Sequence, residues 1–350
     1  MGRIIRQLLT CTPALLIVLA ASAGAQAQGT RQLNLCHAGS VSAVFTAAAN
    51  QFKSQYSGVT VTDLSGGSLA LLRQGVNGIK PCDVYASADS TNIDLFLKPA
   101  GLADYNIIFA QGRMVLAYLA SDPRTAGIAA PGKFDPPGAI PEAAPNWYET
   151  LLAAGVKIGG GHPFLDPGAY RSHLIFQLAQ AYYKAPDLYD RLLEHYLVMA
   201  SAGAAPTAAT PAPALGNQFN FQLGYEHGAQ AAARKNPDYR YVYLPDNIDL
   251  SNSAKNSYYS QAVVVVPGLG LPGTAQSVTI PATRVTWGVT ILNQTPNREN
   301  AIRFLQILLG STGREALAAN GPTPVVPPSV SAKDYRKLPA ALQPLVKSTE

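Results

Sequence analysis

Cysteine and charge are both scarce in this sequence. It contains 3 Cys among 350 residues, and charged residues make up 13% of the chain. So little cysteine excludes a small scaffold held together by disulfides. Lys and Arg number 26 against 21 Asp and Glu, and the basic residues are scattered. Because no basic run with interleaved aromatics is present, we expect no nucleic-acid partner.

Long apolar runs are also rare, and the one that begins the chain resembles a leader. Arg3 and Arg6 precede an apolar stretch, Leu8–Leu19, and a small-x-small sequence ends at Ala27. The apolar stretch is too short for a stable membrane span. We therefore predict that residues 1–27 are a signal peptide, cleaved near Ala27, and that the mature chain is periplasmic or otherwise extracytoplasmic.

The mature chain keeps Cys36 and Cys82. Cys36 lies late in one predicted strand, and Cys82 lies just before another, Asp83–Ala86. If these strands are parallel neighbours, the two cysteines are out of level by about 10 Å, which exceeds the Cα separation that a disulfide allows. We therefore predict that both cysteines are free.

Three successive strand–helix units begin the mature chain. Residues 33–38 and 59–63 have strand character, and each is followed by a turn and a helical pattern that starts behind Ser40 and Ser68. A third strand, residues 83–89, contains Ser87. These units predict an α/β fold with a parallel sheet whose carboxyl edge carries the function.

The three serines would meet at that edge. A helix N-terminus there has unpaired N–H groups and partial positive charge, which suits an anion. Ser40 and Ser68 are each candidate N-caps, and a cap alone explains either one. Three serines at one sheet edge favour a binding site.

The remaining sequence is long enough for a second lobe, because about 320 residues exceed the usual size of one domain. Asp166 precedes Pro167 as an N-cap often does, at the start of a helix over residues 174–184. The other predicted elements are strands at 113–119, 157–162, 239–244, 261–266 and 287–291, helices at 146–152, 188–199, 226–234, 297–309 and 311–318, a flexible insertion at 201–214, and a proline-rich surface tail at 320–328.

The order of these motifs resembles the periplasmic molybdate/tungstate-binding proteins of ABC importers, in particular their tungstate-type branch. The matching segments are 38–42, 67–68, 86–89, 166–171, 243–249, 288–291 and 296–301. The resemblance implies the two-lobed type II periplasmic-binding-protein fold, with mixed, mainly parallel sheets flanked by helices and a ligand cleft between the lobes. Lobe 1 would hold residues 28–112 and 287–350, and lobe 2 residues 113–286.

The same resemblance implies a role for individual residues. Ser40, Ser68 and Ser87 would lie at an oxyanion, Asp166 would be the carboxylate that coordinates its metal centre, and Gly168 and Ala169 would donate backbone N–H groups. The branch has a second carboxylate where this chain has Gly224, so the identity of the oxyanion stays open, and Tyr225 could present its hydroxyl instead. The implied partner is an ABC permease, with no cofactor, no enzymatic activity and a monomeric chain.

Three alternatives keep the same residues in other roles. The fold could bind sulfate, phosphate or an organic anion. His37, His162 and His227, with Asp166 and Glu226, could bind a divalent metal ion. Ser40, Ser68 or Ser87 could be the nucleophile of a secreted hydrolase with a histidine base. The chain lacks a G-x-S-x-G elbow, which disfavours the hydrolase.

Overall fold

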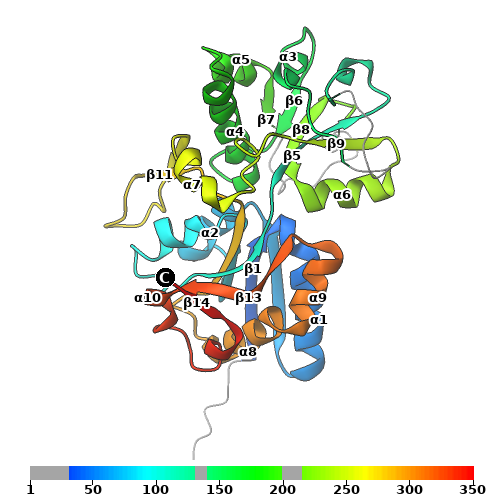
Figure 1. Cartoon of the computed structure of the whole chain (residues 1–350). Helices are drawn as coiled ribbons and strands as arrows, with labels where there is room; N and C mark the ends of the chain where they lie inside the picture. Colours follow the sequence, from blue (N-terminus) through cyan, green and yellow to red (C-terminus); the bar gives the residue numbers. More distant parts are fainter. Residues whose placement is uncertain (1–30, 131–139, 199–214) are drawn as a thin grey trace, which may run out of the picture.

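Two separate sheets divide the chain into two lobes (Figure 1). The computed structural model describes residues 31–130, 140–198 and 215–350. The predicted signal peptide (1–27) and the predicted insertion (201–214) lie outside the described residues. This is a mixed α/β architecture, as predicted, but the sheets are not mainly parallel, because antiparallel strand pairs are as frequent as parallel ones in the two sheets.

Lobe 1 is built on a seven-stranded sheet in the order β14-β13-β4-β12-β3-β1-β2. Its strands are β1 (Gln32–Ala38), β2 (Thr60–Gly66), β3 (Val84–Ser87), β4 (Ile107–Gln111), β12 (Thr286–Ile291), β13 (Thr323–Ser331) and β14 (Lys347–Thr349). Its helices are α1 (Ser42–Gln55), α2 (Ser68–Val76), α8 (Arg298–Leu309), α9 (Ser311–Asn320) and α10 (Ala332–Tyr335).

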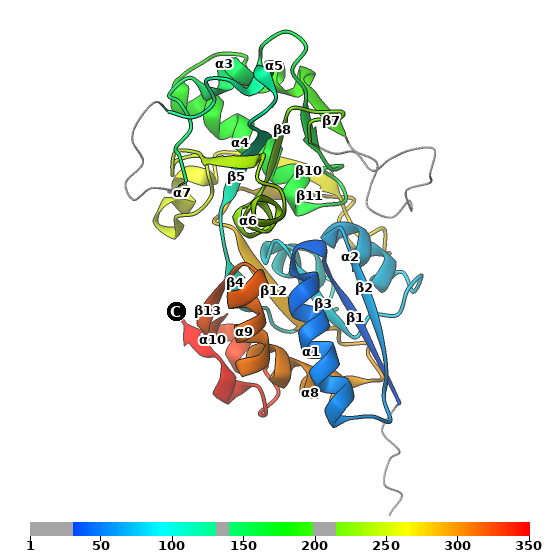
Figure 2. The same ribbon diagram turned by 90° about the vertical axis from the view of Figure 1, so that its right-hand side faces the viewer.

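Strand β1 is the centre of this lobe. It pairs in parallel with β2 on one side and β3 on the other. Because the right-handed crossovers through α1 and α2 run in opposite directions, the two helices cover opposite faces of the sheet (Figure 2). Both faces of β1 are therefore covered, and every residue from Leu33 to Ala38 is buried. The carboxyl ends of β1 and β3 point toward lobe 2.

Lobe 2 is built on a five-stranded sheet in the order β7-β6-β8-β5-β9. Its strands are β5 (Met114–Leu119), β6 (Ile158–Gly160), β7 (Tyr196–Val198), β8 (Phe221–Tyr225) and β9 (Tyr239–Tyr243). Its helices are α3 (Trp147–Leu151), α4 (Pro167–Tyr183), α5 (Leu188–Glu194), α6 (Glu226–Lys235) and α7 (Asn256–Tyr259). A separate hairpin, β10 (Val263–Pro267) and β11 (Ser277–Pro281), lies beside α4.

The two chain crossings between the lobes run side by side. The N–H of Gly112, between β4 and β5, donates to the carbonyl of Val285, just before β12, at 3.0 Å. Trp287 packs against the same point, because a Cβ on Gly112 would lie 3.1 Å from its ring. The buried Trp287 ring therefore lies where the two crossings meet.

Two predictions about elements are wrong. The helix predicted over 188–199 ends at Glu194, and Tyr196–Val198 pairs with β6 as an edge strand. The predicted proline-rich tail contains β13, which pairs with β4 inside the sheet. Its prolines lack N–H donors, and the register shifts between Pro324 and Ser329 where they occur. Sequence alone could not show that β4 would accept such a strand.

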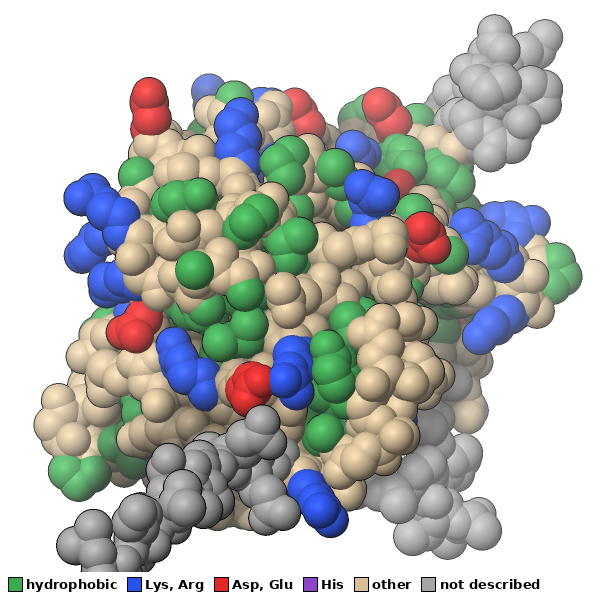
Figure 3. All heavy atoms as spheres, turned by 90° about the horizontal axis from the view of Figure 1, so that it is seen from below, with side chains coloured by type: hydrophobic (Ala, Val, Ile, Leu, Met, Phe, Trp, Pro, Cys, Tyr) green, Lys and Arg blue, Asp and Glu red, His purple; other side chains and the backbone are tan. Residues whose placement is uncertain are grey.

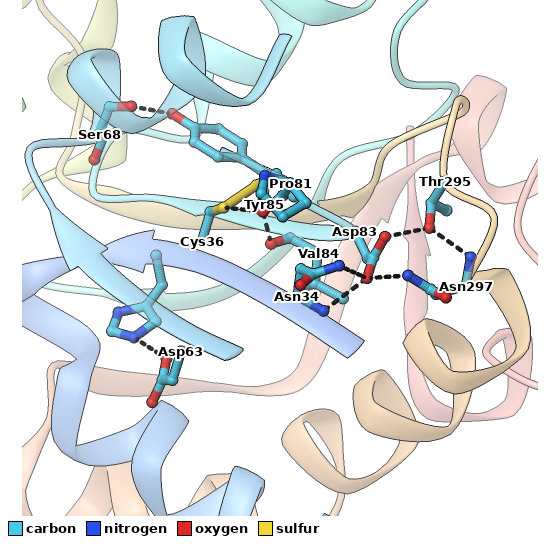
Figure 4. The surroundings of a disulfide bond; sticks show 12 residues. Asn34, Cys36, Asp63, Ser68, Pro81, Asp83, Val84, Tyr85, Thr295 and Asn297 are labelled. Carbon is cyan, nitrogen blue, oxygen red and sulfur yellow. Dashed lines mark hydrogen bonds and ion pairs between the residues drawn. A yellow bond between two sulfur atoms is a disulfide. The ribbon is translucent and has the colours of Figure 1, made fainter. Parts of the chain in front are cut away.

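The prediction that Cys36 and Cys82 stay apart is also wrong. The two form a disulfide with Cα atoms 5.7 Å apart (Figure 4). The register does place Cys36 level with Tyr85, so Cys82 is out of level as expected. However, β3 begins only at Val84, and the chain before it leaves the line of the strand, since the sulfur of Cys36 lies 3.7 Å from the carbonyl oxygen of Pro81. The offset argument assumed a straight strand through Cys82.

Beside the disulfide, a buried carboxylate joins three segments of lobe 1. Asp83 accepts hydrogen bonds from the backbone and side chain of Asn34, from Asn297 and from Thr295 (Figure 4). Three of these bonds reach Oδ2 and one reaches Oδ1, and all of the donors are neutral. The cluster stabilises the end of the sheet opposite lobe 2, and a cavity of about 610 Å³ opens there.

Candidate functional site

The first helix turn of α2 is in direct contact with lobe 2. The N–H groups of Leu69 and Ala70 donate to the carbonyl of Leu165, at 3.1 and 3.2 Å. The contact is so close that a Cβ on Gly67 would lie 2.6 Å from that carbonyl oxygen. A helix N-terminus that sequence analysis predicted as an anion site therefore receives a backbone dipole from the opposite lobe.

Arg73 extends this contact along the same helix. Its guanidinium donates to the carbonyls of Phe164 (2.5 Å), Pro267 (2.6 Å) and Gly268 (3.0 Å), all in lobe 2 or its hairpin. Asn77 donates to Leu269 on the same hairpin at 3.1 Å. Helix α2 is thus attached to lobe 2 along two turns.

Ser40 does not cap a helix, contrary to the prediction. It lies in a short 3-10 turn, Gly39–Val41, and α1 begins only at Ser42, without a side-chain cap. Its hydroxyl accepts from Nε1 of Trp287 at 2.9 Å, and its carbonyl accepts from Nε2 of His227, in lobe 2, at 2.9 Å. A hydroxyl that accepts one bond still has its own hydrogen to donate.

Ser68 is the first residue of α2 rather than its cap, which is Gly67. Its buried hydroxyl accepts from the N–H of Ala88, just after β3, at 3.0 Å. Ser87 has a different environment, because its hydroxyl accepts from the N–H of Asp89 and from Asn92. Ser68 therefore joins two elements at the interface, whereas Ser87 stabilises its own turn.

Asp166 caps helix α4, with Pro167 at the first helical position. Its Oδ1 accepts from the N–H of Gly168 at 2.7 Å and of Ala169 at 3.3 Å. The two amides assigned to the oxyanion by resemblance are thus bonded to Asp166. The carboxyl lies close to lobe 1, because a Cβ on Gly67 would be 3.5 Å from the Cβ of Asp166.

Gly224 and Tyr225 end strand β8. A Cβ on Gly224 would meet no atom within 4 Å, so the position borders open space. The hydroxyl of Tyr225 accepts from Arg171 at 2.7 Å, and a Cβ on Gly168 would lie 3.8 Å from it. The Tyr225 ring packs against Trp287, with centroids 4.9 Å apart.

The structure therefore gathers Ser68, Asp166, Gly168, Ala169 and Tyr225 where the lobes meet. Ser40 joins them through the shared ring of Trp287. Ser87 lies one residue from Ala88 but faces its own loop.

Sequence reasoning gave no role to three side chains of this interface, Arg171, Tyr170 and Trp287, and considered His227 only as a metal ligand. Arg171 and Tyr170 lie in the motif after Asp166. Arg171 also stands close to an apolar run that forms a buried helix face, Leu174–Phe176, and a charged residue beside such a run is a candidate buried charge. Trp287 offered no comparable signal, because it comes from a segment far from the serines in sequence.

Burial shifts the protonation of this interface toward neutral forms. It raises the pKa of the Asp166 carboxyl, against the hydrogen bonds from Gly168 and Ala169. It lowers the pKa of His227, so the ring is neutral near pH 7. It raises the pKa of Tyr225, which stays a phenol.

On the face of lobe 1 that points away from lobe 2, the Lys and Arg side chains are dispersed (Figure 3).

The residues of two alternatives do not converge. Among residues 31–130, 140–198 and 215–350, no three His, Cys, Asp or Glu side chains form a group that could hold a metal ion. His37 instead bonds Asp63 at 2.8 Å. His227 contacts the carbonyl of Ser40 and not its hydroxyl, which is not the geometry of a base activating a nucleophile.

Comparison with known proteins agrees with this architecture. A family model described as bacterial extracellular solute-binding protein matches residues 33–322. The chain belongs to this family. A solute-binding protein of Methanoculleus marisnigri is 32% identical over 333 residues, 90% of this chain and 87% of the relative. The molybdate/tungstate-binding protein WtpA of Thermococcus kodakarensis is 28% identical, with the same coverage of both chains.

Solved structures assign the fold of this solute-binding protein. The sulfate-binding protein SubI of Mycobacterium tuberculosis superposes with a TM-score of 0.56 at 16% identity, over 85% of this chain and 88% of that one. The fold is the two-lobed type II periplasmic-binding-protein fold, as predicted. In the part of the chain that the structure describes, no helix is long and apolar enough to cross a membrane.

Proposed function

We propose that this solute-binding protein captures tungstate or molybdate between its lobes and delivers it to the permease of an ABC importer. The observation that carries the proposal is the convergence of Ser68, from lobe 1, with Asp166 and Tyr225, from lobe 2. The similarity to the molybdate/tungstate-binding protein of Thermococcus kodakarensis supports the choice of ligand. The chain would act as a monomer, after cleavage near Ala27, with the lobe boundaries predicted above.

The chemistry of the site suits a tetrahedral oxyanion. Ser40 and Ser68 each accept one hydrogen bond and keep a hydroxyl hydrogen to donate. Contact between the lobes excludes water, which strengthens each remaining hydrogen bond. Asp166 would repel a dianion unless it coordinates the metal centre or is protonated, and burial favours the protonated form because it raises the pKa of the carboxyl.

Sulfate is the second candidate, and Gly224 favours it. The position has open space and no carboxylate to expand the coordination of a metal centre. A site with hydrogen-bond donors alone holds any tetrahedral dianion of suitable size.

Calorimetric titration of residues 28–350 with tungstate, molybdate, sulfate and phosphate tests the proposal. We expect tungstate and molybdate to bind most tightly. If sulfate binds most tightly, then sulfate is the ligand instead of tungstate or molybdate. If none of the four anions binds, the proposed oxyanion site is wrong.

Substitutions then test the residues. Ser40→Ala and Ser68→Ala should each weaken binding by about 1–3 kcal/mol, the cost of a hydrogen-bond donor lost where the lobes enclose the ligand. Ser54→Ala is the control, because its hydroxyl bonds only the nearby carbonyl of Gln51 on an exposed helix face. Asp166→Asn preserves helix capping, so the melting temperature should stay unchanged. If Asp166 coordinates the metal centre, this variant should bind tungstate more weakly, because an amide does not replace a coordinating carboxylate. Equal losses for tungstate and sulfate would argue against metal coordination by Asp166.

A further inference from the structure

Arg171 is an unusual residue of this interface. Of the Lys and Arg side chains in the described part of the chain, it alone is fully buried, with 1% exposure. It comes from the start of α4 in lobe 2 and reaches lobe 1, where Nη1 donates to the carbonyl of Ala88 at 2.5 Å. A guanidinium stays charged when buried, so a full positive charge lies between the lobes.

The guanidinium lies among the residues proposed to bind the ligand. Nη1 also donates to the hydroxyl of Tyr225 at 2.7 Å. Ala88, whose carbonyl receives the first bond, donates its N–H to Ser68. Asp166 is near enough for the charge of Arg171 to oppose the rise of its pKa. Arg171 therefore contacts both sides of the candidate site.

Part of its hydrogen-bonding capacity is unused. Nη2 is buried and has no hydrogen-bond partner among the described residues. An oxygen of Asp89 lies 3.4 Å from it, as an ion pair without hydrogen-bond geometry. Asp89 itself accepts from the hydroxyls of Tyr170 and Thr91 and from the N–H of Thr91. A buried charged donor without a hydrogen bond is costly, and a bound anion would accept one from it.

We propose that Arg171 is a ligand-binding residue of the cleft: its Nη2 donates to the bound oxyanion, and its charge selects a dianion over a monoanion of the same shape. This inference rests on the proposed oxyanion function. The competing role is purely structural, in which Arg171 only neutralises Asp89 and holds Tyr225.

A pair of substitutions separates the two roles. Arg171→Gln combined with Asp89→Asn removes one positive and one negative charge, so the net charge of the interface is unchanged and no carboxylate is left unpaired. Binding of tungstate, a dianion, and perrhenate, a tetrahedral monoanion, is measured by calorimetry, with melting curves to verify folding. Arg303→Gln, on an exposed face of α8 and paired with Glu299, is the control.

We expect the double variant to lose about 10- to 150-fold in tungstate affinity, the range for a lost hydrogen bond from a charged donor. Perrhenate affinity should fall much less, so the preference for the dianion narrows. Asp89→Asn alone should maintain or raise tungstate affinity, because it removes a negative neighbour and keeps Arg171. If the double variant binds tungstate as the wild type does, Arg171 is structural and the inference is wrong, while the oxyanion function stands.

Two further outcomes are decisive. If the wild type binds no tetrahedral oxyanion, the proposed function and this inference both fail. If the double variant does not fold, Arg171→Lys replaces it, because lysine retains the charge. We then expect weaker binding with the dianion preference retained, and loss of that preference would overturn the inference.

Discussion

Replacing Gly67 with alanine should hold the lobes apart without unfolding either one. The backbone of Gly67 has φ −65°, which alanine adopts without strain. In the structure its added Cβ would lie 2.6 Å from the carbonyl oxygen of Leu165. The lobes must then separate locally, which lengthens the bonds from Leu69 and Ala70 to that carbonyl, now 3.1 and 3.2 Å. Beyond about 3.5 Å such bonds are lost.

The magnitude follows from these two hydrogen bonds. Each bond contributes about 0.5–1.5 kcal/mol net, so the free energy of lobe closure should become less favourable by about 1–3 kcal/mol in the variant. This corresponds to a dissociation constant for the oxyanion that is about 5- to 150-fold larger, as measured by calorimetry. Small-angle scattering at saturating ligand should show a larger radius of gyration than the wild type.

The control for this prediction is Gly58→Ala. A Cβ at Gly58 meets no atom within 4 Å, so its binding should match the wild type. The melting temperature of unliganded Gly67→Ala should also change little, because the clash arises only between lobes. Wild-type affinity and wild-type dimensions for the liganded variant would refute the reasoning that the contact between Gly67 and Leu165 limits how closely the lobes close around the ligand.

Three further predictions concern other contacts. Arg73→Ala removes three hydrogen bonds from the guanidinium to lobe 2 and its hairpin. We expect about tenfold faster release of the ligand, measured by stopped-flow fluorescence. An unchanged release rate would mean that water replaces these bonds at no cost. The double substitution Cys36→Ser with Cys82→Ser removes a disulfide between residues 46 apart in sequence. The free energy of unfolding, measured in urea, should fall by about 2–4 kcal/mol. An unchanged value would show that the disulfide does not form. Burial lowers the pKa of His227. As the pH drops below about 6.5, the unfolded chain therefore takes up a proton before the folded chain does, and the free energy of unfolding should fall between pH 7 and pH 5. His227→Gln, whose amide can still donate to the carbonyl of Ser40, should reduce that decline in thermal melts.

Local chemistry made much of the fold predictable. Strand β1 and helix α1 follow from apolar spacing, and both lie within a few residues of their predicted bounds. The cap at Asp166 follows from the proline behind it, since its geometry depends on only three neighbouring residues. The order of the binding motifs led to the family resemblance and the fold, because the serine turns of lobe 1 and the Asp166 loop of lobe 2 both end where the lobes meet.

What the sequence by itself determined, therefore, is which residues form the βα units and which loops end at the interface. Only the tertiary structure decided how residues from distant segments meet there. Trp287 reaches the hydroxyl of Ser40 across 247 residues, and Arg171 reaches the carbonyl of Ala88 across 83. Cys82 meets Cys36 because the chain turns before β3. Spacing rules describe neighbours along one element, whereas these contacts depend on how whole sheets and lobes pack, and no local pattern encodes that.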